Sequence, residues 1–377
     1  MIAEPQTIDE ACEAIRTSAR AARTMGLTGG EHPGGPASVA VDDVISMRRM
    51  NGVVEYAPSD QIVTVEAGMT IAQLQNLLGE RAQRLAIDPP LPERTTVGGL
   101  VASNAFGPLR TRYGTAKDVI VGMTVVRADG TRARGGGKVV KNVAGFDIPK
   151  LMIGTYGTLA LIATVTFRVH PMPRVRASVA LDGIDPARIR ALTSAMIAAQ
   201  LEPSAVDASY DGERYRYHVT FEGFAAGVRA QCDRFRAIEP SCEPASESSA
   251  FEDASRGELA VKCTAPVSQV EGLHNAAIAP LYRALGNARA CVLPFSGVAL
   301  VSGSLGDVGQ TLDALENARG WCESVGGTLV VQAAPPAVRS AFDAWGTPPP
   351  AFALMRALKD RFDPQRLLQP GSFVGGL

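Results

Sequence analysis

Apolar residues alternate with polar ones in some segments of the first half of the chain and recur with helical spacing in others. From Leu159 to Val169, apolar residues at every second position predict a half-buried β-strand. Val53–Tyr56 and Ile62–Glu66 predict a β-hairpin. Thr7–Ala22 and Thr70–Gly79 place their apolar residues on one face and predict amphipathic helices. The first half therefore mixes strands and helices.

After Pro173, strand-like and helix-like segments alternate regularly. The predicted strands are Ala177–Leu181, Ala205–Ser209, Tyr215–Phe221, Leu259–Cys263, Ala290–Leu293, Val298–Ser302 and Thr328–Gln332, and the predicted helices are Pro186–Gln200, Ala225–Ala237, Val267–Leu285, Val308–Val325 and Ala351–Phe362. Ile238–Gly257 is polar and serine-rich and predicts a loop. This order predicts an α+β fold in which two related halves share an antiparallel sheet.

The length of 377 residues favours two domains over one core. We expect residues 1–173 to form the first domain and residues 174–347 a cap domain, with residues 348–377 packing back on the first. The boundaries rest on the Pro171-Met172-Pro173 break and on the stiff Pro348–Pro350 segment.

Composition narrows the function classes. A formal charge of −1 offers no basic field for nucleic acid and no polybasic patch for a membrane surface. The N-terminus has early acidic residues and no apolar segment, so we expect no signal peptide and a cytoplasmic protein. The longest uncharged run, 290–306, contains proline, glycine and serine and predicts two strands and a turn rather than a transmembrane helix. The six cysteines are dispersed without a C-x-x-C pair, which predicts reduced, buried thiols and neither zinc nor an iron–sulfur cluster.

A glycine pair, Gly98-Gly99, precedes Leu100–Asn104, a run that predicts a helix start. A turn without side chains before a helix leaves backbone N–H groups unpaired, and with the helix dipole it predicts an anion site suited to a pyrophosphate. No G-x-G-x-x-G opens a helix here, and Gly137-Lys138 lacks the other residues of a P-loop. The predicted site is therefore of neither the Rossmann nor the Walker type.

An ordered set of motifs follows this pair: Arg112-Tyr113-Gly114 with Asp118, then Lys141-Asn142-Val143-Ala144-Gly145-Phe146-Asp147, then Gly154-Thr155-Tyr156-Gly157 before the strand. Together with Ile62–Thr70 and with Phe362-Asp363-Pro364 and Leu368-Gln369-Pro370-Gly371, the set resembles the PCMH-type FAD-binding domain of the vanillyl-alcohol oxidase family of flavoproteins. Within that family it is most similar to the FAD-binding subunits of bacterial glycolate oxidases. Gly135–Asp147 is the most discriminating segment.

The resemblance implies one non-covalently bound FAD. Its pyrophosphate would lie at Gly98-Gly99 and its adenosine end near Gly157–Ile162. The implied cofactor-binding residues are Thr28, Gly29, Gly30, Thr96, Gly98, Gly99, Ser103, Asn104, Arg112, Gly114, Asp118, Lys141, Asn142, Gly145, Asp147, Gly157, Leu159 and Ile162. His32 lies in a context one residue away from the pattern that carries covalent flavin, so we expect a loop hydrogen-bonding role for it.

Several of these residues have a second interpretation. Arg110 and Arg112 suit phosphate or the carboxylate of a 2-hydroxy acid, but a surface ion pair explains them equally well. Asp118 and Asp147 match family positions, and each could instead cap a backbone turn. The four histidines form no closely spaced pair, so we expect no metal site. No catalytic residue is assigned from the sequence.

The resemblance implies the FAD-binding subunit of a glycolate oxidase complex. It would oxidise glycolate, or a similar small 2-hydroxy acid, and pass electrons through partner subunits, a second FAD subunit and an iron–sulfur subunit. One alternative is an auxiliary, partner-binding subunit whose FAD is structural or relays electrons, and another is a stand-alone FAD-dependent oxidase of a different hydroxy compound. The same resemblance implies that partner subunits could hold this cytoplasmic protein peripherally at the inner membrane.

Overall fold

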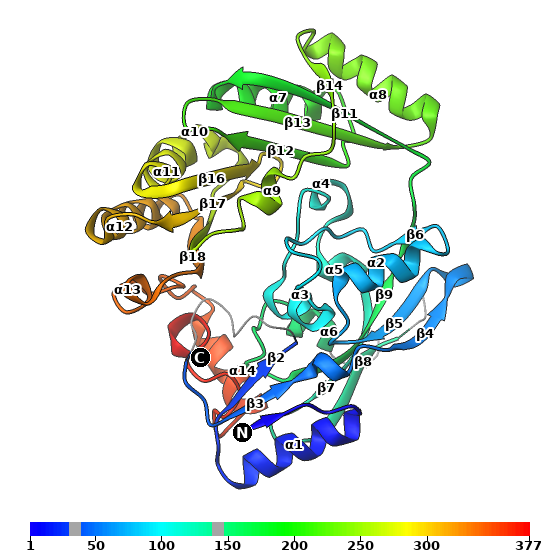
Figure 1. Ribbon diagram of the computed structural model, residues 1–377, viewed down its shortest axis with the longest axis vertical. Helices are drawn as coiled ribbons and strands as arrows, with labels where there is room; N and C mark the ends of the chain where they lie inside the picture. Colours follow the sequence, from blue (N-terminus) through cyan, green and yellow to red (C-terminus); the bar gives the residue numbers. More distant parts are fainter. Residues whose placement is uncertain (30–38, 138–146) are drawn as a thin grey trace. The chain divides into compact units, whose positions relative to one another are not determined.

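The structure is a computed structural model that describes residues 1–29, 39–137 and 147–377, and its backbone divides into two compact units (Figure 1). Unit 1 consists of Met1–Phe106, Gly114–Met172 and Thr347–Leu377, and unit 2 of Gly107–Tyr113 and Pro173–Gly346. The domain boundaries expected from the proline-rich breaks stay a prediction, and Gly107–Tyr113 belongs with unit 2 in the structure.

Unit 1 contains two main sheets. A parallel sheet has the order β1 (Ile2–Ala3), β3 (Asp43–Ser46), β2 (Met25–Thr28), and an antiparallel sheet has the order β4 (Val53–Ala57), β5 (Ile62–Glu66), β9 (Leu161–Arg168), β7 (Ile120–Val126), β8 (Arg132–Gly136). A short pair joins β10 (His170–Pro171) to β6 (Gln83–Arg84). The helices are α1 (Ile8–Arg20), α2 (Ile71–Gly79), α3 (Val97–Ser103), α5 (Ala116–Val119), α6 (Ile148–Met152) and α14 (Phe352–Phe362), with single turns at Met47–Arg49, Pro58–Asp60 and Val374–Gly376.

Strand β9 is the centre of the antiparallel sheet, and this corrects the prediction of a half-buried strand. Every residue from Leu161 to Phe167 is buried. Val165 and Phe167 pack into the cluster formed with α2 and α3, whereas Leu161 and Ala163, beyond a shift in the register of β9 against β7, are buried with α1 and β2. Because both faces are covered, alternation here separates two buried faces rather than core from solvent.

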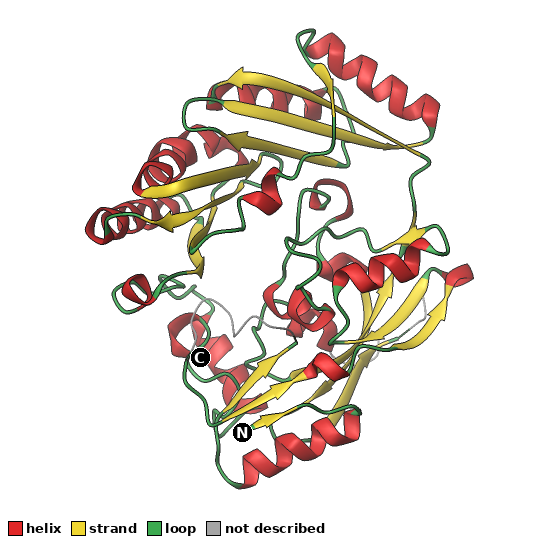
Figure 2. Cartoon of the chain, viewed as in Figure 1, coloured by secondary structure: helices red, strands yellow, loops and turns green. Residues whose placement is uncertain are grey.

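Unit 2 is one antiparallel sheet with its longer helices on one face (Figure 2). Its strands are, in sheet order, β14 (Glu243–Ala245), β11 (Val175–Ile184), β13 (Tyr215–Gly223), β12 (Ala205–Tyr210), β16 (Leu285–Leu293), β17 (Val298–Leu305), β15 (Leu259–Thr264) and β18 (Thr328–Ala333). Its helical segments are α4 (Arg110–Tyr113), α7 (Pro186–Ala198), α8 (Ala225–Ile238), α9 (Ala250–Asp253), a turn at Val267–Gln269, α10 (Val270–Leu273), a π-helical turn His274–Ile278, α11 (Ala279–Ala284), α12 (Val308–Ser324) and α13 (Pro336–Arg339). Each half runs β-α-β-β-α-β, and the halves meet where β12 pairs with β16, as the predicted pair of related halves requires.

The other predicted helices and strands agree with the structure, with two corrections. The segment expected to be a loop, Ile238–Gly257, contains β14 and α9, and the helix expected over Val267–Leu285 is divided into several turns. All six cysteines are free and buried, as predicted. Across the described ranges, no helix is long and apolar enough to cross a membrane.

Candidate functional site

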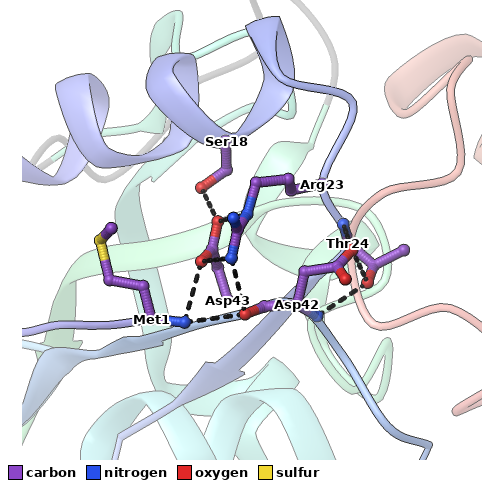
Figure 3. Close-up of polar contacts among 6 residues, drawn as sticks. All are labelled: Met1, Ser18, Arg23, Thr24, Asp42 and Asp43. Atoms are coloured by element: carbon purple, nitrogen blue, oxygen red, sulfur yellow. Dashed lines mark hydrogen bonds and ion pairs between the residues drawn. The ribbon is translucent and has the colours of Figure 1, made fainter.

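Strand β2, which ends at Thr28, pairs with β3, and β3 carries the buried carboxylate of Asp43 (Figure 3). Asp43 of β3 accepts hydrogen bonds from Ser18 Oγ (2.7 Å) and from the Arg23 guanidinium (2.8 and 2.9 Å), and the Met1 amine lies 3.1 Å from it. Burial raises the pKa of Asp43, but these donors outweigh burial and hold that pKa below its ordinary value. The network ties α1 to the parallel sheet, so the position of Thr28 at the end of β2 is set by the fold.

The glycine pair lies inside the first turn of α3 rather than in a turn before it. Thr96 is the N-cap, and its Oγ1 accepts a hydrogen bond from Gly99 N (3.1 Å). The other N–H groups at this end are also bonded: Val97 N to Met69 O (2.8 Å), Gly98 N to Ala67 O (2.8 Å) and Leu100 N to Thr96 O (2.8 Å). The prediction of unpaired N–H groups here is therefore wrong, because neighbouring carbonyls and the capping hydroxyl satisfy them.

Gly98 and Gly29 are glycines for reasons of close packing. A Cβ at Gly98 would lie 3.2 Å from Ala67 O, and one at Gly29 would collide with Thr96 Oγ1. Only a residue without a side chain lets the end of β2 approach the N-cap of α3 this closely. The structure thereby brings Gly29 and Thr96, two predicted site residues far apart in sequence, into contact.

Asn104 ends α3 in the left-handed conformation, with φ 50°. Its Oδ1 atom is buried and has no hydrogen-bond partner among the described residues. Gly154 packs on its Cβ, and Ser103 donates a hydrogen bond to Gly99 O (2.7 Å). A buried acceptor without a donor costs free energy unless a ligand supplies the donor. Asn104 is therefore the described residue that most directly indicates a ligand.

The turn before β9 packs against Leu27, next to Thr28 and Gly29. Gly157 has φ +77°, a conformation that favours glycine, and a Cβ there would lie 3.5 Å from Leu27 Cδ1 and 3.4 Å from Gln369 Cγ. Burial raises the pKa of the preceding Tyr156 to about 12. Leu159 and Ile162 are 7% and 6% exposed and pack in the hydrophobic core of unit 1. Their side chains are therefore part of the hydrophobic core. Only the backbone of this turn is left to contact a cofactor.

The two candidate carboxylates cap local turns. Asp118 Oδ2 accepts a hydrogen bond from Thr115 N (2.8 Å), and Gly114 lies directly against this carboxylate. Asp147 accepts from Lys150 N (3.1 Å) and pairs with Lys150 Nζ (2.8 Å), which lowers the pKa of Asp147. The capping interpretation is confirmed for both residues. Four further candidates, Gly30, Lys141, Asn142 and Gly145, lie outside the described residues, as does His32.

The two candidate arginines of α4 differ in their surroundings. Arg112 pairs with Glu202 (3.1 Å) and donates to its carbonyl oxygen (3.1 Å), with both side chains largely exposed. Arg110 lies close enough to Lys262 of β15 to affect its ionisation: burial lowers the pKa of Lys262, and the Arg110 charge lowers it further. Two partly exposed cations whose charges act on each other favour binding of an anion. The sequence pattern did not single out Lys262 as a site residue. A possible signal was that it is the one charged residue in the apolar run Leu259–Cys263.

A second polar cluster lies on the face of the unit 2 sheet away from the helices. His218 Nε2 bonds to Ser246 O (2.7 Å), its Nδ1 lies 3.6 Å from Asp207, and Asp207 accepts from Ser248 Oγ (2.7 Å). Burial raises the pKa of Asp207, which the Ser248 and His218 contacts oppose. A cavity of about 380 Å³ adjoins the cluster. The cluster holds the segment before α9 on the sheet. Within the described ranges, no group of histidine, cysteine and acidic residues is arranged to hold a metal ion.

Comparison with known proteins decides the cofactor. Residues 1–136 match the family described as "FAD binding domain". The chain carries a PCMH-type FAD-binding domain. Its cofactor is FAD, which confirms the predicted family resemblance and cofactor. The described residues fit the group, since Asn104 offers a buried acceptor that has no partner among them.

The relatives of this FAD-binding domain carry consistent names. Glycolate oxidase subunit GlcE of Escherichia coli is 35% identical over 135 residues, 36% of this chain and 39% of that protein. Glycolate oxidase subunit GlcD of Bacillus subtilis is 28% identical over 166 residues, 44% of this chain and 35% of that protein. D-lactate dehydrogenase of Anaerostipes hadrus is 34% identical over 143 residues, 37% of this chain and 30% of that protein. The matches thus span well under half of each relative.

A solved structure of alkyldihydroxyacetonephosphate synthase has the fold of this chain beyond the FAD-binding domain. Its TM-score is 0.73 at 15% identity, over 98% of this chain and 76% of that one. At this identity the likeness concerns the fold alone, and it confirms the α+β class with a PCMH-type fold.

Proposed function

We propose that this chain is the FAD-binding subunit of an oxidoreductase that converts a small 2-hydroxy acid to the 2-oxo acid, with glycolate as the first substrate to test. The observation that carries the proposal is the shared FAD-binding half. Relatives that match it are named for glycolate, D-lactate and D-2-hydroxyglutarate, which are all 2-hydroxy acids. When bound, FAD would accept the hydride from the α-carbon of the substrate.

Within unit 1, the chain's task is to bind and orient FAD. Gly29, Thr96 and Asn104 would line the cofactor, with the Asn104 Oδ1 atom accepting a hydrogen bond from it. The turn at Gly157 would present backbone to the adenosine end. The pyrophosphate needs donors other than the first N–H groups of α3, since those groups are already bonded. Attachment is non-covalent in this proposal.

Within unit 2, Arg110 and Lys262 would bind the substrate carboxylate. Both are cations, and their mutual repulsion would be relieved by an anion between or beside them. A guanidinium can bind a carboxylate through two parallel hydrogen bonds, while an ammonium adds a compact charge. Strand β18, which neighbours β15, also carries Gln332, whose buried Nε2 donor has no partner in residues 1–29, 39–137 and 147–377.

We assign the chain to a multi-subunit enzyme rather than to an independent oxidase. Its identity to subunit GlcE, 35%, exceeds that to subunit GlcD, 28%, and both names denote parts of a glycolate oxidase. The partners in this proposal are a second FAD subunit and an iron–sulfur subunit that removes the electrons, and they could hold the assembly at the inner face of a membrane. The auxiliary interpretation, with catalysis in the sister subunit, is the second candidate.

Anaerobic mixing of the FAD-loaded chain with glycolate, followed by flavin absorbance, tests these candidates. Bleaching by the chain alone would exclude the auxiliary role and support catalysis here. Bleaching only after the partner subunits are added would support the auxiliary role. Bleaching with another hydroxy compound but with neither glycolate nor D-lactate would favour a stand-alone oxidase and contradict the proposal.

A further inference from the structure

Helix α14 contains a lysine that is withdrawn from solvent and completely bonded. Lys359 is 1% exposed, and its Nζ donates to Thr158 O (2.8 Å), to Asp363 Oδ2 (2.7 Å) and to Leu368 O (2.8 Å). An ammonium group has three N–H donors, and all three have a partner. One side chain therefore joins the turn before β9, the end of α14 and the C-terminal segment.

Asp363 extends this connection. It is 0% exposed, and its two oxygens also accept from Leu367 N (3.0 Å) and Leu368 N (2.8 Å). The carboxylate thus fixes the backbone of the segment that the Lys359 ammonium contacts from the other side. Neither charge could remain in this place without the other, because each would be buried without compensation.

The segment held by this pair runs alongside β2. Met25 N donates to Leu367 O (2.7 Å), and Gln369 N donates to Met25 O (2.8 Å), so the chain extends the parallel sheet at Met25 and Leu368. The Gln369 side chain donates to Leu27 O (3.0 Å) and packs on Gly157. Three separate segments therefore meet at Gln369: the end of β2, the Gly157 turn and the C-terminal segment.

We propose that Lys359 and Asp363 are positioning residues for the FAD site, because they hold Gln369 and the Gly157–Thr158 turn together as the wall that faces the adenosine end of the cofactor. The pair acts through that wall and has no contact with the reacting atoms. The inference rests on the proposed placement of FAD. It assigns a task in cofactor binding to a buried ion pair that would otherwise be counted only toward stability.

Three variants of the full chain separate these roles. Asp363→Asn breaks the buried pair, and Asp360→Asn makes the same chemical change on the same helix at an exposed pair with Arg366. Gln369→Met removes the bond to Leu27 O without touching the buried pair. Each apoprotein would be titrated with FAD and, separately, with FMN, which lacks the adenosine half, and folding would be followed by circular dichroism at the titration temperature.

Asp363→Asn and Gln369→Met should each weaken FAD binding about tenfold or more, the loss that corresponds to one well-placed contact, with FMN binding unchanged. Asp360→Asn should leave both affinities at the wild-type value. Wild-type FAD affinity in folded Asp363→Asn, or equal losses for FAD and FMN, would overturn the proposal. Should Asp363→Asn not fold, Gln369→Met decides, and wild-type FAD affinity there overturns it as well. If the wild-type chain bound FAD no more tightly than FMN, that result would instead contradict the placement of the adenosine end of the cofactor.

Discussion

Two lysines, one in each unit, show how differently a protein can treat a buried positive charge. Lys359 in unit 1 is surrounded by a carboxylate and two carbonyl oxygens, whereas Lys262 in unit 2 lies near a second cation, Arg110. Burial lowers the pKa of both lysines. Near Lys359 the Asp363 carboxylate opposes that shift, and near Lys262 the Arg110 charge adds to it.

The difference indicates two functions. A lysine whose donors all end on the protein is part of the framework, and its removal leaves acceptors and a carboxylate without partners. A lysine whose pKa is lowered further by a neighbouring cation gains free energy when an anion binds beside it. The first kind should affect stability strongly, and the second should affect ligand binding with little cost to stability.

The largest effect should come from Lys359→Met. The change leaves the Asp363 charge buried without its counter-ion, and we expect a loss of about 3–5 kcal/mol in the free energy of unfolding. Denaturant unfolding of the apoprotein measures it. Lys262→Met is the comparison: it removes a repulsion with Arg110 and should stay within about 1 kcal/mol of wild type or be more stable. Equal losses in the two variants would contradict the distinction.

The second-largest effect concerns Asp43. Its carboxylate, like the Lys359 ammonium, is buried and hydrogen-bonded within the protein. Asp43→Asn should cost about 2 kcal/mol at neutral pH, because charged hydrogen bonds from Ser18 and Arg23 are weakened. Since the folded state lowers the pKa of Asp43, its contribution is present above the unfolded pKa, about 3.9, and is lost as pH falls through the folded value. Urea unfolding of both proteins at pH 7 and pH 3 should show the difference shrinking in acid. A difference that persists undiminished would contradict the assignment.

The sequence predicted the helices and strands of this fold more accurately than the burial and bonding partners of its charged and polar groups. Periodicity located α2, α7 and α12 within a residue or two, because each has one covered face. It misjudged β9, since burial of a central strand on both faces depends on what packs over it. The sequence placed the glycine pair at a helix start, but in a turn before the helix rather than inside α3. It also missed that Met69 O and Ala67 O satisfy the helix N–H groups.

The candidate site shows the same limit. The ordered glycine motifs were sufficient to identify an FAD-binding domain, but Arg110 and Arg112 are chemically identical in sequence. Only the fold shows that the charge of Arg110 acts on Lys262, whereas Arg112 pairs with Glu202. A buried lysine such as Lys359 likewise leaves no periodic signal, because its four-residue spacing from Asp363 is also typical of an exposed helical pair.

A smaller effect should appear in anion binding by unit 2. Oxalate, which has carboxylates and no oxidisable C–H bond, serves as the probe. Lys262→Met should weaken oxalate binding about tenfold, because a charged hydrogen bond is lost, and Lys117→Met, at an exposed lysine, should leave it unchanged. In wild type, affinity should fall as pH rises through the pKa of Lys262, which lies below that of an ordinary lysine. Calorimetric titration measures both, and an affinity that is independent of Lys262 would exclude it from the carboxylate site.

The smallest effect should come from Arg112, the neighbour of Arg110 on α4. Its pair with Glu202 is largely exposed, so Arg112→Met should change the free energy of unfolding by about 0–1 kcal/mol. Affinities for FAD and oxalate should remain at the wild-type values, whereas Arg110→Met should weaken oxalate binding as Lys262→Met does. The two variants differ by two positions on one helical turn, which controls for any general disturbance of α4. A loss of FAD affinity in Arg112→Met would restore Arg112 as a cofactor contact and show that the Glu202 pair gives way when FAD binds.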